Sequence, residues 1–225
     1  MNPHSDAKII DSWRKNAEPW TEAVRGGQIA SRERVTNQAI VAAVLQRSPR
    51  SVLDVGCGEG WLCRALSADV ERVVGVDAIP ALVGQAQAAG GGDFRVKTYE
   101  ALGDGSLSEA FDAVVCNFSL LGDTSVETVF ASVPQLLSNA GAFIVQTLHP
   151  VAACGDQPYE DGWRDGSWEG FDPSFVDPAP WYFRTLASWV DLFLDRGLRL
   201  VDIREPLDPA THQPASIIFV GAVSP

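Results

Sequence analysis

The sequence has few of the residues that build metal centres. Its 225 residues include four cysteines and three histidines, no two cysteines have the CxxC spacing, and the histidines are scattered. Because a zinc site needs such ligands in a close, recurrent spacing, we expect no metal site. Cys57 and Cys116 follow apolar residues or lie among them, so we interpret them as small buried residues and not as nucleophiles.

Long apolar runs and an excess of basic charge are also missing. No stretch approaches the length that crosses a bilayer, and the first residues lack the charged-then-apolar order of a signal peptide. The 29 acidic residues outnumber the 17 basic ones, for a formal net charge of −12. A nucleic-acid partner requires clustered Lys and Arg. We therefore expect a cytoplasmic protein that binds neither nucleic acid nor membrane.

Strand-like and helix-like patterns alternate along most of the chain. This alternation predicts a parallel sheet with helices on both faces. The expected strands cover 51–56, 72–77, 93–99, 111–117 and 142–148, and two more cover 198–205 and 215–223. No helix fits between the last two, so they are predicted to form an antiparallel pair at the sheet edge.

Several helices show terminal signals or special residues. Two N-terminal stretches, 7–24 and 31–46, are joined by two glycines. In the first, Trp13 and Trp20 share a helical face, which fits either a helix packed on the sheet domain or a mobile flap over a ligand. Farther along, Thr124 and Glu127 fit a capping box, and Pro134 is expected to kink or shorten the helix that they begin.

The stretch VLDVGCGEG, residues 52–60, combines a strand with Gly56, Gly58 and Gly60. A glycine loop at a strand-to-helix turn brings backbone N–H groups close to a ligand. Asp77, at the end of the next expected strand, is placed to bind both hydroxyls of a ribose. Together these features indicate an adenosine-type ligand, and the alternative interpretation is an ordinary glycine-rich turn.

The spacing of the loop argues against a phosphate ligand. A dinucleotide fingerprint is G-x-G-x-x-G, but Trp61 occupies the place of the third glycine. The chain has no GK[ST] sequence and therefore no P-loop. In addition, Asp54 lies just before the loop, where a carboxylate facing the ligand repels pyrophosphate and suits an ammonium group.

These residues resemble class I S-adenosylmethionine-dependent methyltransferases, in particular the small-molecule branch. VLDVGCGEG is similar to the first motif of the family, Asp77 to its ribose-binding acid, and FDAVVCNFSLL to its fourth-strand motif. The segment YFRTLASWVDLFLDRGLRLVDIREP resembles the helix and sixth strand of that branch. The similarity extends over residues 51–223. It implies an α/β, Rossmann-like, doubly wound sheet of seven mostly parallel strands with an antiparallel C-terminal strand and helices on both faces.

The resemblance also implies a cofactor, S-adenosyl-L-methionine, with S-adenosyl-L-homocysteine as product. The loop backbone would line the methionine part, Asp54 would order the loop near the amino group, and Asp77 would hold the ribose. The residues after the second and third strands would contact the adenine, and those after the fourth would flank the methyl group. In chain order the implied site residues are Asp54, Gly56, Cys57, Gly58, Asp77, Ala78, Ile79, Thr98, Tyr99, Glu100, Asn117 and Phe118. Glu100 stands where many members of the family have an Asp.

Methyl transfer from a sulfonium is an in-line displacement in which positioning does much of the work. A hydroxyl or ammonium acceptor also needs a general base. His149, expected at the end of the fifth strand, is the candidate for this role, with a capping or second-layer histidine as the alternative. Arg184 and Glu205 are expected to form a structural ion pair or helix-end contacts.

The aperiodic segment 151–182 is rich in Gly, Pro, Trp and acids, and long segments of this kind often act as lids. Its aromatics either wall a pocket for an apolar or cationic acceptor or anchor the loop, with the acids as its solvated face. We expect one methyltransferase domain over 1–225. It comprises an N-terminal helical cap (1–47), a cofactor-binding core (48–149), a substrate lid insertion (150–183) and a C-terminal helix with the antiparallel strand pair (184–225).

The predicted function is methyl transfer to a small-molecule acceptor by a monomer or homodimer. One alternative is an NAD(P)-dependent oxidoreductase, which the glycine spacing and Asp54 disfavour. The other is a catalytically inactive regulatory protein that binds S-adenosylmethionine.

Overall fold

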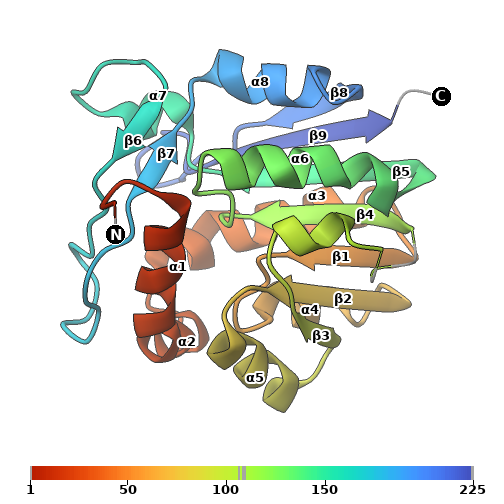
Figure 1. Ribbon diagram of the computed structural model, residues 1–225, viewed down its shortest axis with the longest axis horizontal. Coiled ribbons are helices and arrows are strands. Elements are labelled where there is room, and N and C mark those ends of the chain that lie inside the picture. Colours follow the sequence, from red (N-terminus) through yellow and green to blue (C-terminus); the bar gives the residue numbers. More distant parts are fainter. Residues whose placement is uncertain (1, 106, 108–109, 224–225) are drawn as a thin grey trace.

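The computed structural model describes residues 2–105, 107 and 110–223, so the last two residues of the predicted C-terminal unit lie outside the described residues. The main feature is a seven-stranded sheet with the order β3-β2-β1-β4-β5-β9-β8 (Figure 1). The strands are β1 (Ser51–Val55), β2 (Arg72–Asp77), β3 (Asp93–Val96), β4 (Phe111–Asn117), β5 (Leu137–Thr147), β8 (Leu198–Arg204) and β9 (Ile217–Val223).

The strand directions confirm the fold class that the sequence predicts. Strands β1 to β5 pair in parallel, and β9 runs antiparallel to both β5 and β8. The expected antiparallel pair therefore exists, with β8 at the edge and β9 inside the sheet. The strand order reverses between β1 and β4, and ligands of such sheets bind outside the carboxyl ends of the strands at this point.

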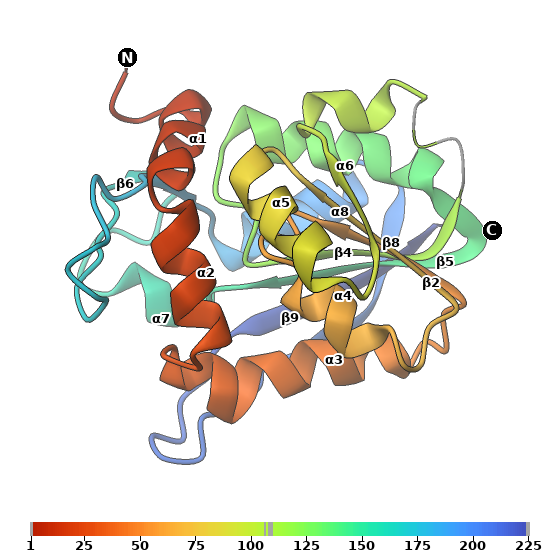
Figure 2. The same cartoon turned by 90° about the horizontal axis from the view of Figure 1, so that it is seen from below.

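Helices cover both faces of the sheet. The helices of the described chain, including those at the sheet edge, are α1 (Asp6–Lys15), α2 (Ala17–Arg25), the π-helix η1 (Arg32–Thr36), α3 (Asn37–Leu45), α4 (Trp61–Leu66), α5 (Pro80–Ala89), the 3-10 helix η2 (Glu100–Gly103), α6 (Thr124–Leu136), α7 (Pro150–Cys154) and α8 (Leu186–Leu194). Two short strands, β6 (Gly162–Arg164) and β7 (Trp181–Phe183), form a separate antiparallel pair. Figure 2 shows α3 and α4 on one side of the sheet, with α6 and α8 on the other.

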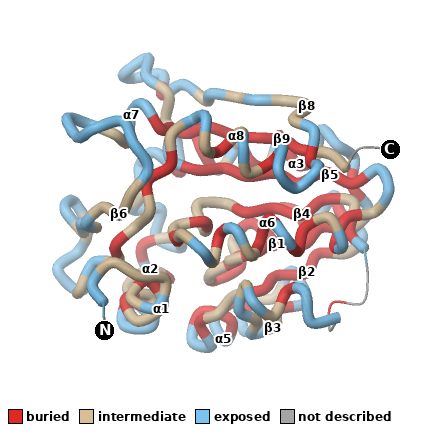
Figure 3. Tube along the Cα trace, turned by 45° about the horizontal axis from the view of Figure 1, so that its top comes forward, coloured by how far each residue is buried: buried red, intermediate tan, exposed pale blue. Residues whose placement is uncertain are grey.

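Two apolar cores lie on the two faces, and the alternation of side chains along each strand explains them. In β4, Val114 and Cys116 belong to the core beneath α6 and α8, whereas Ala113 and Val115 belong to the core beneath α3 and α4. Because both faces are covered, the central strands are buried almost throughout (Figure 3). The sheet therefore holds the carboxyl ends of its strands rigidly.

The first helical stretch is two helices and not one as predicted. Helix α1 ends at Lys15, and α2 begins at Ala17, after Asn16. Pro19 lacks the N–H group that would continue the α1 hydrogen-bond ladder, which accounts for the break. Trp13 and Trp20 nevertheless touch, with ring centroids 5.0 Å apart. Both helices lie at the carboxyl edge of the sheet, on the side of the molecule where β6 and β7 also lie (Figure 1).

The predicted capping box of α6 is also wrong. Thr124 is the first residue of the helix, and the cap comes from Asp6 at the start of α1. The Asp6 carboxylate accepts from the backbone N–H of Asp123 at 2.9 Å and of Ser125 at 3.2 Å, and from the Thr124 hydroxyl at 2.8 Å. A negative charge at this position also complements the helix dipole. Pro134 lies inside the helix, which continues to Leu136, and the predicted kinking or shortening by Pro134 stays a prediction.

Candidate functional site

The glycine loop after β1 has a backbone that requires glycine. Gly56, Gly58 and Gly60 have φ angles of 76°, 56° and 86°. A Cβ on Gly56 would lie 2.3 Å from the Cβ of Ser119, and one on Gly60 would lie 2.8 Å from the ring of Phe94. At Gly58 the nearest atom is Trp20 Nε1, at 3.7 Å. Gly56 and Gly60 therefore permit close packing, whereas a Cβ on Gly58 would make only an ordinary van der Waals contact.

The loop and Asp77 form one hydrogen-bonded unit. The Asp77 carboxylate accepts from the backbone N–H of Gly58 at 2.9 Å and of Ile79 at 2.8 Å. The backbone N–H groups of Gly56 and Cys57 both donate to Val76 O. Burial raises the pKa of Asp77, and the backbone hydrogen bonds partly offset this rise. The predicted ribose acid is thus fixed at the end of β2, beside the loop.

Asp54 is buried at the base of the loop. The residue is 2% exposed, and its Oδ2 accepts from the Cys63 thiol at 3.5 Å. Burial raises its pKa from 3.8 to about 7. Asp54 packs under α4, which is consistent with ordering the loop. Its predicted place beside a ligand amino group stays a prediction.

This buried carboxyl makes stability depend on pH. The folded state holds a proton on Asp54 that the unfolded state releases, so stability falls as pH rises from about 4 to about 7. We expect Asp54→Asn to remove this dependence and to stabilise the protein at pH 8 by on the order of 2–4 kcal/mol. Melting temperatures of both proteins between pH 5 and pH 8 provide the test. Parallel pH profiles would show that Asp54 is ionised throughout.

Glu59 is a site residue that sequence reasoning missed. Its side chain has no exposed surface and accepts from Arg25 Nε at 2.7 Å and from Arg64 Nη2 at 2.6 Å. Arg25 belongs to α2 and Arg64 to α4, so Glu59 joins the glycine loop to the N-terminal helices. The sequence signal that could have indicated Glu59 is a charged residue between two loop glycines, Gly58 and Gly60.

The end of β4 supplies the next part of the site. Asn117 Oδ1 accepts from Gln146 Nε2 of β5 at 2.7 Å. Phe118 adopts φ 53°, an uncommon left-handed conformation for an aromatic residue, and such strain often marks functional positions. The Tyr99 hydroxyl donates to Ser119 O at 2.8 Å, so the ends of β3 and β4 are tied together.

The residues predicted to contact the adenine lie at the same edge of the sheet but in different surroundings. Ile79 is 3% exposed and packs with Ala17 of α2. Ala78 is half-buried, whereas Thr98 and Glu100 are exposed. Their predicted roles toward a ligand stay predictions.

His149 is the N-cap residue of α7, as one of the predicted alternatives has it, but its side chain pairs with Glu205 and does not cap the helix. His149 Nε2 and Glu205 Oε1 are 2.7 Å apart, and the histidine is 8% exposed. Among the described residues, His149 Nδ1 is buried without a hydrogen-bond partner. The predicted Arg184–Glu205 pair is therefore wrong. Arg184 instead donates to the carbonyl groups of Gly122 and Asp123 before α6, which is the predicted alternative of a helix-end contact.

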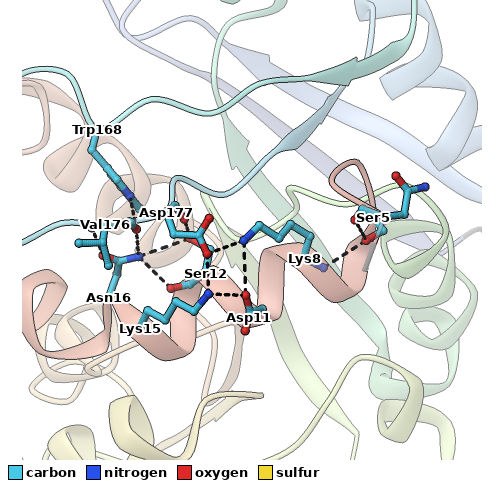
Figure 4. Close-up of polar contacts among 10 residues, drawn as sticks. Ser5, Lys8, Asp11, Ser12, Lys15, Asn16, Trp168, Val176 and Asp177 are labelled. Carbon is cyan, nitrogen blue, oxygen red and sulfur yellow. Dashed lines mark hydrogen bonds and ion pairs between the residues drawn. The ribbon is translucent and has the colours of Figure 1, made fainter.

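The N-terminal helix α1 is bound to the segment predicted as a lid (Figure 4). Asn16 Nδ2 donates to Val176 O at 2.7 Å, and Val176 N–H donates to Asn16 Oδ1 at 2.9 Å. Asp177 forms ion pairs with Lys8 and, at 2.6 Å, with Lys15. Helix α2 also contacts α5, so these helices pack on the sheet domain. The mobile flap over a ligand stays a prediction.

Anchoring explains much of the composition of the lid. Trp168 packs against Phe171, Phe175 and Trp13. The acids that the sequence places here mostly face solvent, as Asp156, Glu160, Asp161, Asp165, Glu169 and Asp172 do. The segment is more ordered than predicted, since it contains α7 and the β6–β7 pair. Trp181 and Tyr182 are different because they line a cavity of about 20 Å³ at the ends of β4 and β5.

Other kinds of site find little support among the residues that the structure describes. Burial raises the pKa of the Cys57, Cys63 and Cys116 thiols, which makes them poor nucleophiles. No group of three or more His, Cys, Asp or Glu in the described ranges is arranged to hold a metal ion. Across the same ranges, no helix is both long and apolar enough to cross a membrane.

Comparison with known proteins agrees with this geometry. Residues 52–141 match the family model described as the methyltransferase domain. A Schizosaccharomyces pombe protein described as an uncharacterized methyltransferase is 34% identical over 82 residues, which are 36% of this chain and 32% of the relative. The chain therefore matches about a third of that relative's length.

Solved methyltransferase structures share the fold. The Burkholderia thailandensis 1,6-didemethyltoxoflavin-N1-methyltransferase is 19% identical with a TM-score of 0.68, over 97% of this chain and 88% of that chain. An S-adenosylmethionine-dependent methyltransferase of Mesorhizobium loti is 20% identical with a TM-score of 0.61, over 81% of this chain and 95% of that chain. The chain therefore has the fold of these solved structures, and its residues 52–141 are similar to the methyltransferase domain.

Proposed function

We propose that this chain transfers a methyl group from S-adenosylmethionine to a small-molecule acceptor. The observation that carries the proposal is the unit formed by Gly58 and Asp77 at the carboxyl edge of the sheet, where the Gly58 N–H donates to the Asp77 carboxylate at 2.9 Å. The antiparallel β9 between β5 and β8 argues against the alternative of an NAD(P)-dependent oxidoreductase, whose usual sheet order is 3-2-1-4-5-6.

The residues at this edge fit the cofactor. Gly58 leaves room for close approach, and each oxygen of the Asp77 carboxylate keeps capacity for a ribose hydroxyl beyond its backbone bond. Gly56 and Cys57 would present backbone to the methionine part, with Ala78, Ile79, Thr98, Tyr99 and Glu100 around the base and Asn117 and Phe118 near the methyl group. When bound, the cofactor supplies an activated methyl group with a neutral thioether as its leaving group.

His149 is proposed as the general base. In a neutral histidine one ring nitrogen carries the proton and the other accepts. The Glu205 carboxylate 2.7 Å from Nε2 favours the proton there, which leaves the buried Nδ1 as the proton acceptor. His149 follows β5 three residues after Gln146, which pairs with Asn117 of β4. The base and the methyl-flanking residues therefore extend from adjacent strands.

The lid, residues 150–183, is proposed to cover the acceptor. Tyr182 N–H donates to Leu121 O at 2.7 Å, which holds β7 against the loop after β4. The cavity between them, about 20 Å³, has room for about one water molecule. An acceptor would therefore enter by displacing the β6–β7 pair. The acids of the segment face solvent, so an apolar acceptor fits better than a cationic one. We propose a cytoplasmic monomer or homodimer with no nucleic-acid or membrane partner.

Calorimetric titration with S-adenosylhomocysteine and a methyl-transfer assay over a panel of hydroxyl and amine acceptors test this function. We expect binding, turnover, and a fall in kcat of about 100-fold in His149→Ala, since general bases contribute 10²–10⁴-fold. His212→Asn, at an exposed turn, is the matched control.

Absence of S-adenosylhomocysteine binding would refute the function. Binding without turnover of any acceptor would favour the predicted alternative of an inactive regulatory protein. Turnover that His149→Ala leaves unchanged would remove the base assignment alone.

A further inference from the structure

Arg32 is a buried cation beside the glycine loop to which the proposed function gives no role. Its side chain lies on η1, and the residue is 8% exposed. The guanidinium is 4.9 Å from the ring of Trp61, the first residue of α4, and 5.5 Å from the ring of Trp20 on α2. Trp20 Nε1 in turn is the atom nearest to the position that a Cβ on Gly58 would take, at 3.7 Å. Arg32 therefore lies where the loop, α4 and α2 meet.

The Arg32 guanidinium is incompletely paired. Nε donates to Asn37 Oδ1 at 3.3 Å, but among the described residues Nη2 is buried without a partner. The nearby carboxylates have other partners. Glu59 binds Arg25 and Arg64, Glu33 accepts from Asn37 Nδ2, and Asp54 accepts from the Cys63 thiol. Burial lowers the pKa of Arg32 to about 10, so it stays charged at neutral pH. A buried charge without full hydrogen bonding is costly, which points to a ligand anion.

We propose that Arg32 binds the carboxylate of the amino-acid end of S-adenosylmethionine. The inference rests on the proposed function, in which the backbone of the glycine loop adjoins the methionine part. A planar guanidinium matches a carboxylate, and the two tryptophan faces hold it in one plane. A phosphate fits less well, because Asp54, Glu59 and Asp77 surround the loop with acids.

The π-helix explains how this side chain reaches the site. The i→i+5 bond from Asn37 N–H to Arg32 O widens the turn between α2 and α3. On the same face, Thr36 Oγ1 is a second buried polar atom without a partner among the described residues. Thr36 O accepts from Gln146 Nε2 at 3.1 Å, so this face adjoins the ends of β4 and β5. Arg32 also touches Trp20, so carboxylate binding would fasten the N-terminal helices over the cofactor.

Two ligands that differ only in the carboxylate test this assignment. Affinities of the full chain are measured calorimetrically for S-adenosylhomocysteine and for its decarboxylated analogue, S-adenosyl-3-thiopropylamine. We expect Arg32→Gln to weaken S-adenosylhomocysteine binding by about 10- to 100-fold, as for loss of a charge-assisted hydrogen bond. Affinity for the analogue is expected to change less than about threefold. The analogue has no carboxylate, so replacing Arg32 removes no interaction with it.

Arg34→Gln is the matched control, because Arg34 is on the same segment but pairs with Asp208 at 2.8 Å. It should leave both affinities unchanged. Arg32→Lys keeps the positive charge but lacks the planar guanidinium, and it replaces the Gln variant if that variant does not fold. We expect it to lose less affinity for S-adenosylhomocysteine than Arg32→Gln, again without a change for the analogue. Equal losses for both ligands, or a wild-type protein that binds them equally, would overturn the assignment. A change only in the KM of the acceptor would mean that Arg32 binds an acidic acceptor. Failure of the wild-type protein to bind either ligand would instead refute the proposed function.

Discussion

Replacing Asp77 by Ala should weaken S-adenosylhomocysteine binding by about 100-fold or more. The substitution would remove the two charge-assisted hydrogen bonds proposed to the ribose, each worth about 1.5–3 kcal/mol. It would also leave the backbone N–H groups of Gly58 and Ile79 without the acceptor that holds the loop conformation. Calorimetric titration of the purified variant measures the loss.

Asp112→Asn is the control for this prediction. Asp112 lies near the N-terminal end of β4, away from the candidate site. Its carboxylate accepts from the backbone N–H of Arg50 at 2.9 Å and of Ser51 at 3.1 Å. The control should lose stability but keep its affinity. An Asp77→Ala protein with a normal melting temperature and unchanged affinity would exclude Asp77 from the cofactor site.

Gly56→Ala is expected to lower the free energy of unfolding by about 2–5 kcal/mol. A left-handed φ costs a non-glycine residue about 1–2 kcal/mol, and overpacking commonly adds about 1–3 kcal/mol. Here the new methyl would lie 2.3 Å from Ser119 Cβ, so the loops after β1 and β4 would have to separate. Thermal unfolding should show a melting temperature lower by about 5–15 °C.

Gly84→Ala is the matched glycine control. Gly84 lies inside α5, is exposed, and has no other atom within 4 Å of the position that a Cβ would take. Alanine there should stabilise the helix by up to about 1 kcal/mol. If the two variants had similar melting temperatures, the loop at Gly56 would be free to relax, contrary to its close packing.

The features that could be predicted from the sequence are those written in local patterns. Apolar runs set the strands, and the glycines and Asp77 set the carboxyl edge of β1 and β2, because each depends on neighbouring residues. The break at Asn16 was equally local, with Pro19 as its signal, but the apolar period ran through it. The expected cofactor, S-adenosylmethionine, follows from the resemblance to a known family, because periodicity carries no information on ligand identity.

Long-range contacts could not be predicted in this way. Asp6 caps a helix more than 100 residues away, and Glu205 pairs with His149 across β9. Arg32 looks like one more surface arginine in the sequence RERVT, and only the packing of Trp20 and Trp61 around it shows that it is buried. Each of these pairs depends on where the sheet brings distant segments together.

The Asp6 cap on α6 shows that the segment matched by the family model is stabilised by residues outside it. The segment that matches the methyltransferase family, residues 52–141, contains α6, but the carboxylate that completes the first turn of this helix lies on α1. In the same way, β5 begins inside the segment and takes its outer neighbour, β9, from beyond it. The segment that matches the family model therefore lacks partners that the rest of the chain supplies, and excising it would leave a helix terminus and a sheet edge unsatisfied.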